Sequence, residues 1–191
     1  MSQKSRPDPR AEHSRRMILR AALDEFARVG YAGFRMESVA AGARVGRSTL
    51  YRHWPNKTAL IADALETLNV QPDPGREVPT ATAREQVRIL LEHLARALSE
   101  SAVSACIPAL VHAAQKEPDI RRFFHVYSAL RRQRLTASIT SGVDDGQFPE
   151  RIDPEAASVA LSGALFYRRL ATDEPAEPEF LEALIDTVLG G

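Results

Sequence analysis

The sequence predicts an all-α protein. Apolar residues recur three and four positions apart along most of the chain, and the apolar–polar alternation of strands is absent. Prolines and glycines separate the helical segments from one another. The 191 residues, of which 44% are hydrophobic and 26% charged, are enough to bury a core without disulfides or metal ions.

The N-terminal part begins with an arm and a long helix. Residues 1–12 contain two prolines, several cations and almost nothing apolar, so we expect a flexible basic arm. In residues 13–29, apolar side chains recur at every fourth position from Ile18, which indicates a helix. Gly30 is expected to end it, because glycine is common just past a helix C-terminus.

Three short helices are expected next, over residues 36–43, 46–53 and 57–68. Asn56 is suited to cap the third of them through its side-chain oxygen. Residues 69–79 contain three prolines and a glycine and are expected to form a loop.

Longer helices are expected in the rest of the chain. Residues 87–98 carry an apolar stripe, and residues 103–115 are apolar around most of the helix, which is typical of a position inside a core. Pro108 is expected to kink this second helix or to mark its first turn. A third helix is expected over residues 118–141, ended by Gly142.

Two final helices follow a turn at residues 144–146. Asp153 is a good cap for the first of them, which has proline at its first position and is expected to extend to about residue 170. The last helix is expected over residues 178–189.

The net charge of zero conceals an uneven distribution. Residues 1–57 contain twelve Lys and Arg against five Asp and Glu, a net charge of +7, and the remaining residues carry −7. A basic segment of this kind favours binding to a polyanion such as nucleic acid. Charge asymmetry of this size also arises by chance in proteins of two parts.

Several classes of protein and site are disfavoured. The single cysteine, Cys106, allows no internal disulfide and no Cys-rich zinc site, and on an apolar helix it is expected to be an inert core residue. The histidines are scattered, and no catalytic or phosphate-binding motif is present, so we expect no metal, no cofactor and no enzyme. The longest uncharged stretch, residues 101–115, is too short to cross a membrane, and no signal peptide is visible, which favours a cytoplasmic protein.

Residues 35–57, RMESVAAGARVGRSTLYRHWPNK, fit a helix-turn-helix, whose second helix enters the major groove of DNA. Two short helices joined by a turn are also common in other helical proteins. The side chains expected to face inward are Val39, Ala43, Val45, Leu50 and Trp54. Those expected mostly to face outward are Arg44, Arg47, Ser48, Thr49, Tyr51, Arg52 and His53, a set suited to guanine edges and phosphates.

The segment Thr49-Leu50-Tyr51-Arg52-His53-Trp54-Pro55-Asn56-Lys57, followed by Ala59-Leu60, closely resembles the helix-turn-helix signature of the TetR family of transcriptional repressors. Phe26, Gly30, Tyr31, Val39, Ala40 and Ala43 also stand at core positions of that family. The resemblance is specific over about residues 14–65. Beyond them only the layout of five further helices matches.

The resemblance implies a three-helix DNA-binding head, residues 13–57, and a helical ligand-binding and dimerisation body, residues 58–191. It implies a homodimeric repressor that a small-molecule ligand releases from a palindromic DNA operator. An activator or a protein-regulated regulator with the same head is the alternative. An enzyme with an added DNA-binding head and an architectural DNA-binding protein are two further alternatives from other classes.

The resemblance also implies roles for residues of the head. Tyr51, His53 and Lys57 match family residues that contact phosphates. The family has a capping, phosphate-contacting threonine where Met36 stands, so Arg35 or Ser38 is expected to take over that contact. The predicted DNA-binding residues are Arg35, Ser38, Arg44, Arg47, Ser48, Thr49, Tyr51, Arg52, His53 and Lys57.

Two further departures from the family lie at the turn and at the start of the recognition helix. Arg44 replaces the turn glycine, and a left-handed conformation there would cost about 1–2 kcal/mol. Gly46 replaces a capping serine, and glycine is an acceptable cap without a side-chain contact. Arg47 is predicted to meet a base edge, with a phosphate contact as the alternative.

The body is expected to hold the ligand and the dimer interface. Aromatic and polar side chains on three apolar helices are typical of a ligand pocket, although an aromatic stripe is also typical of plain core. The expected lining is Cys106, His112, Phe123, Phe124, Tyr127 and Arg131. The last two helices are expected to pair with their symmetry mates in a four-helix bundle, unless both stripes are covered within one chain. The expected interface is Ala160, Gly163, Ala164, Leu181, Leu184, Ile185 and Val188.

Overall fold

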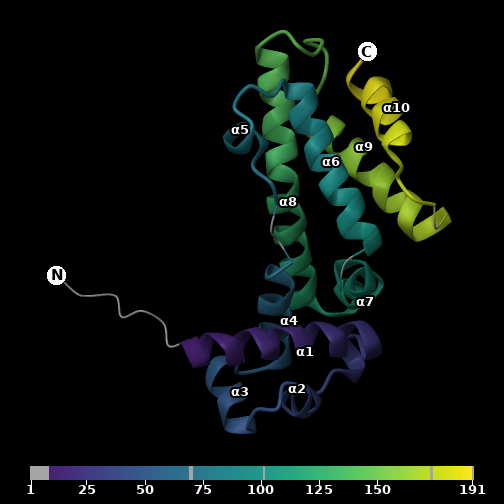
Figure 1. Cartoon of the computed structure of the whole chain (residues 1–191). Coiled ribbons are helices and arrows are strands. Elements are labelled where there is room, and N and C mark those ends of the chain that lie inside the picture. The colour runs from purple at the N-terminus through teal and green to yellow at the C-terminus, as the bar shows by residue number, and fades with distance from the viewer. Residues whose placement is uncertain (1–8, 69–70, 101, 173, 191) are drawn as a thin grey trace. The chain divides into compact units, whose positions relative to one another are not determined.

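The computed structural model describes residues 9–68, 71–100, 102–172 and 174–190. Their regular secondary structure is entirely helical, with turns and loops between the helices and without a strand in these ranges (Figure 1). The α-helices are α1 (Pro9–Gly33), α2 (Met36–Gly42), α3 (Arg47–His53), α4 (Lys57–Glu66), α5 (Pro74–Glu77), α6 (Ala83–Glu100), α7 (Ala102–Lys116), α8 (Pro118–Asp144), α9 (Pro154–Tyr167) and α10 (Pro178–Leu189). A π-helix, η1 (Arg168–Thr172), continues α9. The all-α prediction is confirmed.

The described residues form two compact units. The first contains α1 to α4 together with Ala105–Phe124, and the second contains the remaining described residues. The first unit is larger than the head expected at residues 13–57, because α4 and parts of α7 and α8 belong to it.

In the first unit, α1 packs against α2 and α4, and α2 packs against α3 (Figure 1). Its buried core includes Ile18, Ala22, Phe26, Val39, Leu50, Trp54, Leu60, Ile61, Cys106, Leu110 and Ile120. Leu50 and Trp54 are therefore inward, as their pattern predicts. Asn56 caps α4 by accepting a hydrogen bond from the N–H of Ala59 at 2.9 Å, as predicted.

The first helix begins earlier than predicted and is broken at Gly30, as predicted. Residues 1–8 of the expected arm lie outside the described residues, and residues 9–12 belong to α1. Pro9 suits the first position of a helix, and Glu12 in the first turn interacts favourably with the helix dipole. At Gly30 the backbone has φ 63° and breaks the helix, after which one more helical turn extends to Gly33.

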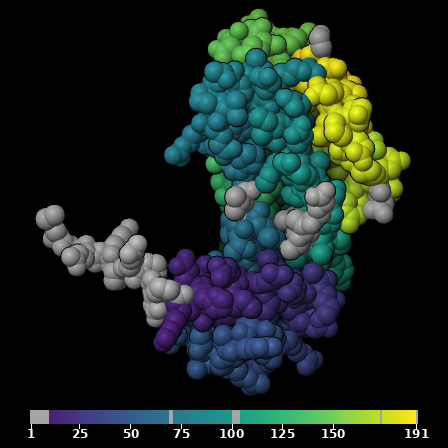
Figure 2. Space-filling model, viewed as in Figure 1, coloured from purple at the N-terminus to yellow at the C-terminus, as the bar shows by residue number. Residues whose placement is uncertain are grey.

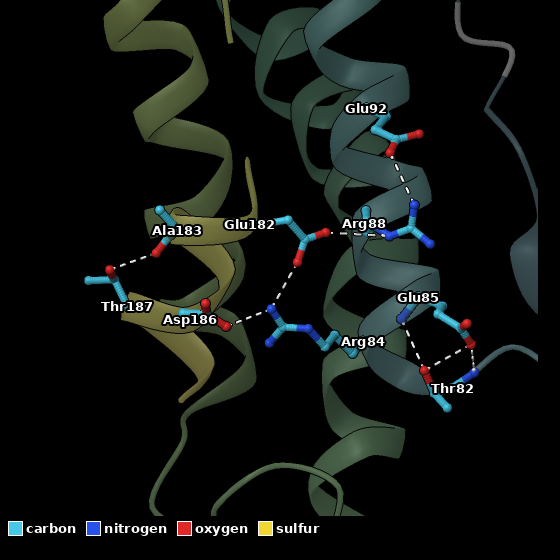
Figure 3. A network of polar contacts seen from close by, with 9 residues as sticks. All are labelled: Thr82, Arg84, Glu85, Arg88, Glu92, Glu182, Ala183, Asp186 and Thr187. Carbon is cyan, nitrogen blue, oxygen red and sulfur yellow. Dashed lines mark hydrogen bonds and ion pairs between the residues drawn. The ribbon is translucent and has the colours of Figure 1, made fainter. Parts of the chain in front are cut away.

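In the second unit, α6 packs against α9 and α10, which also pack against each other. Arg84 of α6 bonds to Glu182 at 2.9 Å and to Asp186 at 2.5 Å, both on α10 (Figure 3). The hydrogen bond to Asp186 contributes most to raising the pKa of the Arg84 guanidinium, and the hydrogen bond to Glu182 contributes next. At the start of α6, Thr82 and Glu85 form a capping box, with the N–H of Thr82 donating to Glu85 at 2.7 Å.

Two helix details differ from the prediction, and for Pro108 one of two predicted alternatives is excluded. α8 does not end at Gly142 but continues to Asp144, and the chain turns at Gly146, where φ is 70°. Pro108 lies inside α7 and does not mark its first turn. The predicted loop over residues 69–79 contains the single turn of α5, in its described part.

Gly142 is needed for close packing. A Cβ added there would lie 2.4 Å from ring atoms of Phe148 and 2.7 Å from the Cβ of Ala83. Helix α8 approaches these two residues so closely that only glycine fits. These contacts explain a glycine that the sequence pattern assigns to a helix end.

Asp153 caps α9 by accepting from the N–H of Ala156 at 2.7 Å, as predicted. The α-helical part ends at Tyr167, and η1 extends the helix to Thr172. No single described helix is long and apolar enough to span a membrane. Among the described residues, one bent pair of helices, Ala83–Ser99 and Ser104–Lys116, together has the length and composition of a membrane span.

Candidate nucleic-acid interface

A Schellman motif joins the two helices of the helix-turn-helix. The N–H of Arg44 donates to the carbonyl of Ala41 at 3.1 Å, and the N–H of Val45 donates to that of Ala40 at 3.0 Å. In this motif the residue that follows the C-cap has a left-handed backbone. Here that residue is Arg44, with φ 57°. Within the described ranges it is the only residue other than glycine with positive φ, so the strain predicted for this position is present.

Neither helix of the motif begins with a side-chain cap. The N-cap of α3 is Gly46 and that of α2 is Arg35, and neither makes a side-chain hydrogen bond to the helix. Helix α2 begins at Met36, as the sequence predicts, and Met36 does not cap it. Met36 is the first helical residue, and its side chain is buried in the core. Its apolar side chain is stabilised by burial, and the capping position falls one residue earlier.

The outward side chains of α3 are polar and exposed. Figure 2 shows the blue segment that contains α3 at the surface. The side chains of Arg47, Ser48 and Arg52 are exposed and make no hydrogen bond or ion pair with another residue in the described part of the chain. Of the other predicted DNA-binding residues, Arg35, Ser38, Arg44, Tyr51 and His53 are exposed, and Thr49 and Lys57 are partly buried. The fold thus leaves guanidinium and hydroxyl donors available to an external acceptor.

The carboxylate of Asp63 ties three elements of the head together. It accepts from the indole N–H of Trp54, the C-cap of α3, at 2.8 Å. Both of its oxygens also bond to Arg15 of α1, at 2.7 and 2.6 Å. Because Asp63 lies on α4, this one side chain fixes the end of α3 against α1 and α4. Sequence reasoning missed it, since the partners are far apart in the chain.

Lys57 is held by the end of α1. Its ammonium group donates to the carbonyl of Tyr31 at 2.8 Å and lies 4.0 Å from the centre of the Tyr31 ring. The hydroxyls of Tyr31 and Thr58 are 2.8 Å apart. The ammonium has two further protons to donate, so it can hold Tyr31 and still meet an anion.

Glu37 is a second residue that sequence reasoning missed. The hydroxyl of Tyr51 donates to its carboxylate at 3.3 Å. Glu37 is the only acidic residue among residues 35–57, a signal that was present in the sequence. A tyrosine hydroxyl has one proton, so Tyr51 cannot donate to Glu37 and to a phosphate at the same time.

The six predicted ligand residues are divided between the two units. Cys106, His112, Phe123 and Phe124 belong to the first, and Tyr127 and Arg131 to the second. Cys106 is buried, its thiol lies 3.7 Å from the carbonyl of Leu23, and burial raises its pKa to about 11, as expected for an inert core thiol. His112 is exposed, and Arg131 lies 5.7 Å from the centre of the Tyr127 ring.

Two of the predicted interface residues are buried inside the single chain. Leu181 and Ile185 are 2% and 0% exposed, because α10 packs on α6 and α9. They cannot contact a second chain unless the fold opens, which corrects the prediction for these two residues. Ala160 and Gly163 are exposed, and Ala164, Leu184 and Val188 are partly buried. The described residues contain no group of three His, Cys, Asp or Glu side chains that could hold a metal ion.

Comparison with known proteins finds the same organisation. A family model of bacterial regulatory proteins of the tetR family matches residues 18–64, and a model of the tetracyclin repressor-like C-terminal domain matches residues 78–188. The HTH-type transcriptional regulator YdeS of Bacillus subtilis is 26% identical over 99% of this chain and 94% of its own length. The DNA-binding transcriptional repressor TetR of Mycobacteroides abscessus is 28% identical over 94% of each chain.

Solved structures agree at the level of the fold. The transcriptional regulator FadR of Bacillus subtilis, in complex with stearoyl-CoA, superposes with a TM-score of 0.72 over 92% of this chain and 98% of its own, at 16% identity. The C-terminal family model alone covers more than half of the residues. With a helix-turn-helix head and this body, the chain belongs to the TetR family of helix-turn-helix transcriptional regulators.

Proposed function

We propose that the protein is a transcriptional repressor that binds a palindromic DNA operator as a homodimer and is released by a small-molecule ligand. The observation that carries the proposal is the outer face of α3. Its exposed arginines have no internal partner among the described residues, and they lie in a segment of net charge +7. A surface of this kind is stabilised when phosphates and base edges supply the acceptors.

The DNA-contacting residues of the proposal follow from their positions. Arg47 begins α3, the end of a recognition helix that meets base edges, and is assigned to a guanine. His53 and Lys57 flank the end of α3 and are assigned to phosphates. The remaining contacts are assigned to Arg35, Ser38, Arg44, Ser48, Thr49, Tyr51 and Arg52.

The homodimer is supported by apolar side chains that one chain leaves exposed. Val159 of α9 is 50% exposed, and Tyr167 at its end is 65% exposed. The small residues Ala160 and Gly163 lie between them and allow a second helix to approach closely. The proposed interface is Val159, Ala160, Gly163, Ala164, Tyr167, Leu184 and Val188. Sedimentation that finds only single chains at micromolar concentration would exclude it.

The proposed release of DNA requires a bound small-molecule ligand. It is supported by the shared fold of FadR, which was solved with stearoyl-CoA. The proposed contacts are Cys106, His112, Phe123, Phe124, Tyr127 and Arg131. A coupling free energy of about 1–3 kcal/mol is sufficient for a measurable release of DNA.

A reporter gene under control of DNA that the purified protein retains tests the regulatory role. Repression in the presence of the protein supports a repressor, and increased transcription identifies the activator that the same head also allows. A gel-shift titration with a library of hydrophobic compounds tests release. If no compound weakens the complex, the ligand-controlled switch is excluded for that chemical class.

A further inference from the structure

Arg44 combines two properties that are rarely found together. Its backbone is left-handed, with φ 57°, and its long cationic side chain is exposed. The other described residues with positive φ are Gly30, Gly146 and Gly190. Glycine adopts this conformation without a steric penalty, because it has no Cβ. An arginine at this position therefore lowers the free energy of unfolding of the head, compared with glycine.

The fold itself requires the conformation but not the arginine. The Schellman hydrogen bonds, from Arg44 to Ala41 and from Val45 to Ala40, use backbone atoms that glycine would supply equally well. The guanidinium group makes no hydrogen bond or ion pair with any residue in the described ranges. No hydrogen bond or ion pair of its side chain inside the described structure therefore compensates for the strain.

The position of Arg44 indicates which interaction compensates for the strain of its backbone. It lies in the turn that leads into α3, whose first residue is Arg47, and its side chain is exposed like those of Arg47 and Arg52. In helix-turn-helix complexes the second helix enters the major groove, and residues beside it meet the sugar-phosphate backbone. A guanidinium group matches a phosphate with two parallel hydrogen bonds.

We propose that Arg44 is a phosphate-contact residue. Its left-handed backbone lowers the stability of the head, and its guanidinium group raises the affinity for DNA. The inference rests on the proposed DNA-binding function and adds a role for the strained turn. A phosphate carries no sequence information, so Arg44 sets the affinity and its salt dependence. Base selection then belongs to the side chains of α3.

The test is the substitution Arg44→Gly, which removes the strain and the cation together. Its Tm should rise by about 2–4 °C. Its Kd should increase by about 3–10-fold, both for a duplex enriched from random DNA by the parent protein and for a random-sequence duplex of equal length. The plot of log K against log salt should become less steep by about 0.9 per bound chain.

Two control variants separate charge from strain. Arg44→Lys keeps the cation and the left-handed position, so its salt dependence should equal that of the parent and its Tm should not rise. Arg151→Gly removes an exposed arginine from a turn of the second unit and changes the net charge by the same amount. Its DNA affinity should be unchanged.

A higher Tm together with weaker DNA binding in the Arg44→Gly protein supports the inference. An Arg44→Gly protein that binds both duplexes as tightly as the parent overturns it, as does a lowered Tm. A loss confined to the enriched duplex also overturns it, because Arg44 would then read a base. If the parent enriches no sequence and retains neither duplex, the proposed DNA-binding function itself fails, whatever the change in Tm.

Discussion

Arg47 and Lys57 are both cations at the first position of a helix, but their environments differ. Arg47 is exposed and has no partner in the described part of the chain, whereas Lys57 is partly buried and donates to Tyr31. A free guanidinium at the start of α3 can turn toward a base edge. An ammonium fixed against the end of α1 is better suited to a phosphate at one position.

Arg47→Ala is expected to weaken binding by about 1–3 kcal/mol and to relax the preference at one base pair in each half-site. Selection from random DNA measures the change. Lys57→Gln is the matched control, since its amide can still donate to the Tyr31 carbonyl without the charge. It should weaken all sequences alike. If Arg47→Ala enriches the parent's motif with equal sharpness, specificity resides in Ser48, Thr49 or Arg52.

Cys106 is expected to make stability fall at alkaline pH. Burial raises the pKa of its thiol from the ordinary value of 9.0 to about 11. The unfolded chain therefore loses this proton at lower pH than the folded chain does. The contribution is complete below pH 9 and is lost as pH rises toward 11, by up to about 1.4 kcal/mol per pH unit. Urea unfolding at pH 8 and at pH 10 measures it, and Cys106→Ala should show a smaller decrease.

At the scale of the elements, local patterns were predictable and long-range contacts were not. Asn56 and Asp153 cap their helices as predicted, because a cap depends on residues three positions apart. The strain at Arg44 was also predictable, because the TetR family, which the sequence resembles, has glycine at this turn position. Gly142 was misread, because its reason is contact with Phe148 and Ala83. The Asp63 contacts join residues that no sequence period relates.

The exposure of the candidate residues was likewise predictable where it depends on a local pattern, and not where it depends on packing between helices. The helical period of residues 46–53 predicts which side chains of α3 face outward, and the structure agrees for Arg47, Ser48 and Arg52. The contact between Tyr51 and Glu37 depends on how α2 and α3 cross, which periodicity alone does not specify. The burial of Leu181 and Ile185 likewise depends on the packing of α10 inside the second unit.

Removal of the Asp63 carboxylate is expected to loosen α3. Asp63→Ala should lower the free energy of unfolding by about 1–3 kcal/mol, because it leaves the buried Trp54 N–H without an acceptor. Trp54→Phe removes that donor and keeps most of the ring. In a double-mutant cycle measured by urea unfolding, the two changes should be coupled by at least about 0.5 kcal/mol. Strict additivity would contradict a shared hydrogen bond.

Gly142→Ala is expected to destabilise the second unit, although alanine is the better helix former by about 1 kcal/mol. The added methyl group would displace Phe148, and such overpacking costs about 1–3 kcal/mol. Thermal unfolding measures the change. The smaller side chain in Phe148→Leu should restore part of the loss in the double variant. An increase in Tm for Gly142→Ala alone would show that α8 adapts without strain.

At the scale of the whole molecule, charge and assembly bear on the same function. The basic residues 1–57 attract DNA, and the remaining residues, with net charge −7, repel it, so only one end of each chain is suited to the duplex. A second chain related by a two-fold axis would present an identical head. Two identical heads related in this way require two half-sites with the same symmetry.

Selection of bound duplexes from random DNA by the full-length protein tests this central claim most directly. At about 0.15 M salt the enriched sequences should contain a palindrome, and the footprint on it should cover both half-sites. Enrichment of a single unrepeated motif would contradict binding by a symmetric dimer. Uniform coating of all duplexes without enrichment would contradict sequence-specific regulation altogether.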